Sequence, residues 1–140
     1  MIERIGPLDA KRRIDEGGYA YLDVRSVGEF EQGHPNGAYN VPLLHMASGG
    51  MVPNPDFLGA IERAFERDAK LILGCQSGVR SLRAAEMLLE AGFTHVLELR
   101  PGYGGTRGPF GEVKEPGWHA AGLPTSTEAA TGRSWEELGR

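Results

Sequence analysis

Apolar and polar positions follow two different spacings along this chain of 140 residues. Short apolar runs at 19–24, 70–74 and 94–99 are typical of buried parallel strands. Elsewhere apolar residues recur every three or four positions, which is typical of helices with one buried face. These spacings predict helices at 7–16, 57–67 and 82–91, short helices after Ser26 and at 118–121, and a short strand at 38–41.

Strands that alternate with helices predict an α/β fold with a central, mainly parallel sheet and helices on both faces. The length suits one domain, which we place at residues 1–124, followed by a C-terminal extension at 125–140 that is polar and rich in small residues. Residues 44–55 contain Ser48-Gly49-Gly50 and several prolines, so we expect a loop there.

The only cysteine, Cys75, lies where a predicted strand meets a predicted helix. The first turn of a helix, here expected to begin after an N-cap at Ser81, presents unpaired amides and the positive end of the dipole. Gly78 allows the loop to turn further amides inward, and Arg80 adds a positive charge. A lone cysteine is more often a small buried apolar residue, but this placement favours a nucleophilic thiolate.

Composition and charge narrow the functions further. The net charge is −4 and no basic cluster is present, which argues against a nucleic-acid surface. No apolar run is long enough to span a membrane, and the N-terminus lacks the apolar core of a signal peptide. A single reactive thiol suits a reducing compartment, so we expect a cytoplasmic protein. The histidines lack the spacing of metal ligands, so neither a metal site nor a cofactor is expected.

The chain resembles the single-domain rhodaneses, a family of sulfurtransferases, from about residue 5 to residue 124. The matching segments are Tyr21-Leu22-Asp23-Val24-Arg25, Glu29-Phe30, Gly33-His34, Gly37-Ala38, Asn40-Val41-Pro42, Cys75-Gln76-Ser77-Gly78-Val79-Arg80-Ser81, Gly104-Gly105, Trp118 and Gly122-Leu123-Pro124. The resemblance implies a rhodanese-like three-layer fold. It also implies that Asp23, Arg25 and His34 mostly support the fold.

The resemblance further implies a catalytic role for Cys75, which would take a sulfane sulfur as a persulfide and pass it to an acceptor. The implied substrate-binding loop consists of Gln76, Ser77, Gly78, Val79 and Arg80. The expected donor is thiosulfate, a persulfide or a polysulfide, and the expected acceptor is a thiol or a sulfur-carrier protein. No nucleic-acid or membrane partner is expected.

Two features depart from the family's usual pattern. Residues 106–117 separate the glycine pair from Trp118, which indicates an inserted surface loop near the mouth of the site. Members that prefer thiosulfate often carry basic residues directly after the cysteine, whereas this chain has Gln76 and Ser77, and Glu29 lies near the family's rim. We therefore expect weak attraction of a dianion and a high KM for thiosulfate.

Two other functions stay open. Cysteine-based phosphatases and arsenate reductases also use a cysteine–arginine anion loop, but related dual-specificity phosphatases have one more residue than the four between Cys75 and Arg80. The tighter loop fits a sulfur atom better than a phosphate, and no general-acid aspartate is recognisable. A rhodanese module that only binds partners is the second alternative. Inactive relatives generally lose the cysteine, which is present here.

Overall fold

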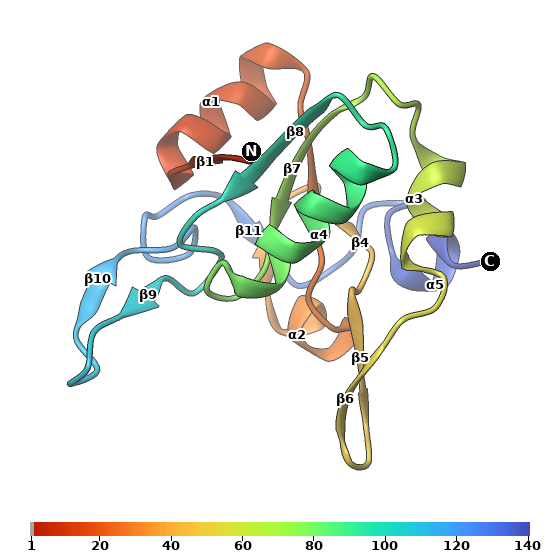
Figure 1. Ribbon diagram of the computed structural model, residues 1–140. Coiled ribbons are helices and arrows are strands. Elements are labelled where there is room, and N and C mark those ends of the chain that lie inside the picture. The colour runs from red at the N-terminus through yellow and green to blue at the C-terminus, as the bar shows by residue number, and fades with distance from the viewer. Residues whose placement is uncertain (1) are drawn as a thin grey trace.

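The computed structural model describes residues 2–140 (Figure 1). Within these residues, the centre of the protein is a five-stranded sheet with the strand order β1-β8-β7-β2-β4. All neighbouring strands in it run parallel. The strand bounds are β1 Glu3–Ile5, β2 Ala20–Asp23, β4 Tyr39–Asn40, β7 Lys70–Gly74 and β8 His95–Leu99.

Helices cover both faces of this sheet, as expected from the sequence (Figure 1). One face packs against α1 and α2, and the other against α3, α4 and α5. The helix bounds are α1 Pro7–Gly17, α2 Val27–Gln32, α3 Phe57–Ala64, α4 Val79–Glu90 and α5 Trp135–Leu138. Successive side chains of a strand point to opposite faces. Leu71 and Leu73 of β7 therefore join the core under α3 and α4, while Ile72 joins the core under α1 and α2. The predicted three-layer α/β fold is confirmed.

Local sequence signals explain where several helices begin and end. Pro7 occupies the first turn of α1, where its missing N–H costs nothing. Ser26 and Glu29 form the predicted capping box of α2, with each side chain accepting from the other residue's backbone amide. Gly92 follows α4 with a φ of 98°, a conformation that glycine adopts without steric cost.

Three predicted segments differ from the structure. Residues 44–55 are not all loop, because β5 (Leu44–Ala47) and β6 (Gly50–Pro53) form an antiparallel hairpin closed by a tight turn at Ser48 and Gly49. The helix predicted at 57–67 ends at Ala64, because Phe65 is already extended. The helix predicted at 118–121 is a series of hydrogen-bonded turns, in which the Ala121 amide donates to Gly117 O at 3.1 Å.

The inserted segment is a second hairpin, formed by β9 (Thr106–Arg107) and β10 (Val113–Glu115), and it projects from the body (Figure 1). A third small sheet joins β3 (His34–Pro35) to β11 (Thr125–Ser126) of the extension. His34 is buried, and its two ring nitrogens lie 2.6 Å from Phe30 O and 3.0 Å from Glu128 O. His34 is therefore a structural residue whose ring contacts two backbone carbonyls, as expected.

The C-terminal extension packs on the body. The backbone amide of Asn40 in β4 donates to Arg133 O at 2.9 Å, and the Arg133 guanidinium donates to Gly37 O at 2.8 Å. Trp135 and Leu138 of α5 pack against the core. The extension therefore adds a strand and a helix to the fold, while the domain boundary at residue 124 stays a prediction.

Candidate active site

Cys75 follows directly after β7, on the face of the sheet that α4 covers. The residue is 1% exposed, and its Sγ accepts a hydrogen bond from the Gly78 amide at 3.1 Å. Among the hydrogen bonds of residues 2–140, the Gly78 amide is the backbone donor to this sulfur. Of the inward-facing amides that the sequence predicted between Gln76 and Arg80, this contact shows the one of Gly78, and the others stay a prediction.

The helix after the cysteine begins three residues earlier than predicted. Gly78 is its N-cap, with a φ of 95°, and Val79 and Arg80 belong to the first turn of α4 instead of the loop. Glycine at this φ turns the chain into the helix immediately after the cysteine loop. Ser81 is therefore not the cap. It is a buried residue of the first turn, and its hydroxyl oxygen lies 3.3 Å from Cys75 Sγ.

A glycine-rich segment after β8 supports the cysteine loop from behind. The Tyr103 amide donates to Cys75 O at 2.7 Å, and the Gly104 amide donates to Gln76 O at 2.9 Å. A side chain at Gly102 would place its Cβ 2.6 Å from Cys75 O, so only glycine fits this close approach. Residues 102–104 thus hold the loop in place.

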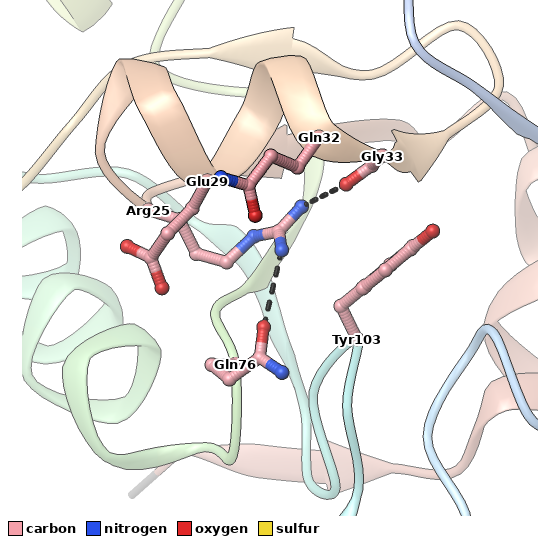
Figure 2. A pocket seen from close by; sticks show the side chains of 6 residues that line it. All are labelled: Arg25, Glu29, Gln32, Gly33, Gln76 and Tyr103. Atoms are coloured by element: carbon pink, nitrogen blue, oxygen red, sulfur yellow. Dashed lines mark hydrogen bonds between the residues drawn. The ribbon is translucent and has the colours of Figure 1, made fainter.

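A polar pocket of about 320 Å³ lies beside the cysteine loop (Figure 2). Its lining residues are Arg25, Glu29, Gln32, Gly33, Gln76 and Tyr103. As Figure 2 shows, the Arg25 guanidinium donates to Gln76 Oε1 at 3.1 Å and to Gly33 O at 2.7 Å. The same guanidinium stacks over the Tyr103 ring at 4.5 Å. Of the predicted loop residues, Gln76 is the one that lines this pocket.

Asp23 and Arg25 form a buried ion pair at the end of β2, with Arg25 Nη2 2.8 Å from Asp23 Oδ2. Burial alone lowers the pKa of Arg25, but the hydrogen bonds and the charge of Asp23 raise it, so the guanidinium stays charged. Removing one member of such a pair leaves an unpaired buried charge, which is strongly destabilising. The pair is the structural junction that the sequence predicted, and it also positions Gln76.

Arg80 is paired with Glu29. The two guanidinium nitrogens Nη1 and Nη2 lie 2.8 and 3.0 Å from the two oxygens of the Glu29 carboxylate. Burial acts to raise the pKa of Glu29, but hydrogen bonds from Arg80 and the Ser26 amide lower it to about 2. The positive charge expected to offset the thiolate is therefore largely compensated by Glu29. Val79 is 76% exposed, and Ser77 is also exposed.

Two residues near the cysteine loop, Glu98 and Arg4, were not predicted from the sequence. Glu98 of β8 is fully buried, and its carboxylate accepts a hydrogen bond from Ser81 Oγ. Arg4 lies beside Glu98 on the neighbouring strand β1, and its Nε is 2.5 Å from Glu98 Oε1. A glutamate inside an otherwise apolar strand is an unusual residue type to bury, and this was the available signal for Glu98.

The structure also bears on two predicted absences. Among residues 2–140, no group of three or more histidine, cysteine, aspartate or glutamate side chains is arranged to hold a metal ion. Within the same part of the chain, none of the helices is both long and apolar enough to cross a membrane.

Comparisons with known proteins place this site in a family context. Residues 7–107 match the rhodanese-like domain. Thiosulfate sulfurtransferase 16, chloroplastic, of Arabidopsis thaliana is 44% identical over 108 residues, which cover 77% of this chain and 80% of that protein. Senescence-associated protein DIN1 of Raphanus sativus is 44% identical over 97 residues, which cover 69% of this chain but only 53% of the radish protein.

A solved structure agrees with these sequence matches. The crystal structure of Rv0390 from M. tuberculosis has a TM-score of 0.74 and 30% sequence identity, with 90% of this chain and 98% of that chain covered. The domain match covers well over half of the sequence. The chain therefore belongs to the rhodanese-like family.

Proposed function

We propose that this protein is a sulfurtransferase that moves a sulfane sulfur from a donor through a Cys75 persulfide to a thiophilic acceptor. The observation that carries the proposal is the position of Cys75. Its sulfur accepts a hydrogen bond from the backbone amide of Gly78 at the N-terminus of α4. A helix N-terminus stabilises negative charge on a thiolate or on a persulfide. A relative named as a thiosulfate sulfurtransferase supports the same reaction class.

The proposed reaction has two steps. The Cys75 thiolate attacks the outer sulfur of the donor, and the sulfur–sulfur bond of the donor breaks. With thiosulfate the leaving group is sulfite, and Cys75 keeps the transferred sulfur as a persulfide. The acceptor nucleophile then attacks the terminal sulfur, and Cys75 leaves as a thiolate. The Gly78 amide and the dipole of α4 stabilise the negative sulfur in both steps.

The charges around the pocket favour a persulfide or polysulfide donor over thiosulfate. Arg25 is paired with Asp23, and Arg80 is paired with Glu29. The pocket therefore offers little uncompensated positive charge to a dianion. The proposed acceptor is a thiol or a sulfur-carrier protein. The cytoplasm stays the predicted location, and the name of the Arabidopsis relative assigns that protein to the chloroplast.

Mass spectrometry tests the proposed function. After the protein is mixed with thiosulfate or with a polysulfide and then digested, the peptide that contains Cys75 is expected to gain about 32 Da, the mass of one sulfur. Addition of cyanide should remove this mass and release thiocyanate. A chain that stays unmodified with both donors, or that hydrolyses a phosphate ester instead, contradicts the proposal.

Replacing Glu29 with glutamine is expected to lower the KM for thiosulfate about three- to tenfold at low salt, because it removes a negative charge from the pocket and frees Arg80. Glutamine still suits the capping box of α2. Glu31→Gln is the matched control, since Glu31 is an exposed residue of the same helix. The KM values come from steady-state thiocyanate formation. Equal changes in both variants, or a gain that persists at high salt, would show that Glu29 does not control donor attraction.

A further inference from the structure

We propose that Glu98 takes the thiol proton of Cys75 through the hydroxyl group of Ser81, so that the nucleophile is generated inside the protein. The proposal rests on the proposed function, because it explains how the buried thiol becomes the attacking thiolate. Cys75, Ser81 and Glu98 are each at most 1% exposed, so bulk water has little access to the proton. A buried thiol that must ionise needs an acceptor within the structure.

The three side chains form a continuous chain of contacts. Ser81 Oγ lies 3.3 Å from Cys75 Sγ and also hydrogen-bonds Glu98 Oε2. Strand register brings these groups together, because Leu73 of β7 pairs with Glu98 of β8, and Cys75 follows two residues after Leu73 on the same face. Ser81 lies in the first turn of α4, and its side chain points to both groups.

The number of hydrogen atoms fixes the direction of these bonds. The Ser81 hydroxyl carries one hydrogen and an ionised carboxylate only accepts, so Ser81 donates to Glu98 while Glu98 is charged. The hydroxyl oxygen then faces Cys75 as an acceptor, which suits a thiol that donates its S–H. After transfer, both bonds reverse: the protonated Glu98 donates to Ser81, and Ser81 donates to the thiolate. Each state therefore keeps both hydrogen bonds.

The proton balance of the step is complete. The Cys75 S–H bond and the Ser81 O–H bond break, while a new Ser81 O–H bond and a Glu98 O–H bond form. The negative charge moves from Glu98 to the sulfur, where the Gly78 amide and the N-terminus of α4 stabilise it. When Cys75 leaves the persulfide as a thiolate in the second step, the same path returns the proton.

Arg4 leaves the accepting oxygen of Glu98 available. Its Nε donates to Oε1, whereas Ser81 bonds Oε2, so the two partners occupy different oxygens. Arg4 Nη2 also donates to Gly78 O at 3.2 Å, which links the carboxylate to the residue whose amide contacts the sulfur. The Arg4 side chain is 36% exposed, so its charge stays hydrated whether Glu98 is ionised or protonated.

Other groups near Glu98 do not replace it as the acceptor. Arg100, two residues after Glu98, is positively charged and therefore cannot accept a proton. Burial raises the pKa of Tyr21 well above its ordinary value, so this residue stays neutral. Arg4 bonds Glu98 directly, and Cys75 is joined to it through Ser81.

The test compares Glu98→Gln and Ser81→Ala with the wild-type protein. We measure single-turnover persulfide formation and the rate of iodoacetamide alkylation of Cys75 from about pH 6 to 9. At pH 7 each variant is expected to lose about tenfold or more in both rates, because neither can pass the proton on. The double variant should be no slower than either single one, since all three break the same path. Raising the pH should narrow the deficit of the variants, because a higher hydroxide concentration partly offsets the low exposure of the thiol.

Two controls separate the relay from a structural effect. Glu86→Gln changes an exposed carboxylate on α4 and should keep wild-type rates. Thermal unfolding checks the fold, and Ser81→Ala keeps the ion pair between Arg4 and Glu98 if Glu98→Gln fails to fold. A wild-type rate in either variant, or a deficit that is the same at every pH, overturns the relay. The two proposals can fail separately, because alkylation requires no sulfur transfer. A wild-type protein that does not load sulfur refutes the proposed function. The pH profile of alkylation still shows whether the relay exists.

Discussion

Cys75→Ser is expected to abolish sulfur loading and thiocyanate formation while leaving the fold intact. An alcohol oxygen at this position is neither ionised near neutral pH nor able to form a persulfide, so the first step has no nucleophile. Serine is close in size to cysteine and still accepts from the Gly78 amide, so the free energy of unfolding should change by only about 1 kcal/mol. Thiocyanate release and the mass of the Cys75 peptide measure the activity, and chemical denaturation measures the stability.

The serine variant also tests whether Cys75 takes part in the reaction at all. Catalysis that survives the substitution would remove Cys75 from the reaction, and with it the sulfurtransferase proposal. Cys75→Ala is the matched control, because it also lacks the sulfur but cannot hydrogen-bond to the Gly78 amide or to Ser81. We expect both variants to lose activity equally and the alanine variant to be the less stable. This result would show that the sulfur is needed for the reaction, whereas the hydrogen bonds at this position contribute to stability.

Gly102→Ala is expected to destabilise the protein by about 3 kcal/mol or more and to displace the cysteine loop. The φ of Gly102 is 69°, which is unfavourable for a residue with a Cβ. The added carbon would also lie 2.6 Å from Cys75 O and from backbone atoms of Gln76, none of which has the freedom of a side chain to move away. Sulfur loading should fall with stability, because the loop that carries the nucleophile rests on this contact.

Two other glycines separate the causes of that loss. Gly18 has a φ of 74°, and a methyl group added there would meet nothing within 4 Å, so Gly18→Ala carries the backbone cost alone, about 1 kcal/mol. Gly28 lies in α2 in open space, and Gly28→Ala should be neutral or slightly stabilising. Urea denaturation of the three variants gives the comparison. If Gly102→Ala is no less stable than Gly18→Ala, the cysteine loop can move away from the added carbon without loss of stability, and the prediction is wrong.

The sequence predicted those parts of the fold that depend on short stretches of chain. The buried run of β7, the capping box of Ser26 and Glu29, and the placement of Cys75 between a strand and a helix all follow from neighbouring residues. The β5–β6 hairpin was missed because Ser48-Gly49-Gly50 indicates a flexible loop as readily as a tight turn. The cap predicted at Ser81 is wrong because serine is only a common N-cap, whereas the left-handed Gly78 begins the helix earlier.

The contacts behind the sulfur could not be predicted, because they depend on strand order. Arg4 and Glu98 are separated by 94 residues and meet only because β1 lies beside β8. β1 has three residues, of which Glu3 and Arg4 are exposed, so no apolar run marks it as a strand. Pairing of Arg80 with Glu29 likewise depends on how α2 and α4 approach each other across the loop.

The C-terminal extension also affects how copies of this protein behave toward one another. β4 is an outer strand of the central sheet, and the Asn40 amide would otherwise be free to pair with a strand from another molecule. Arg133 O accepts from that amide, and α5 packs alongside β4. Unprotected sheet edges promote aggregation. These last residues therefore occupy part of this sheet edge and leave less of it open to pairing with a strand from another molecule.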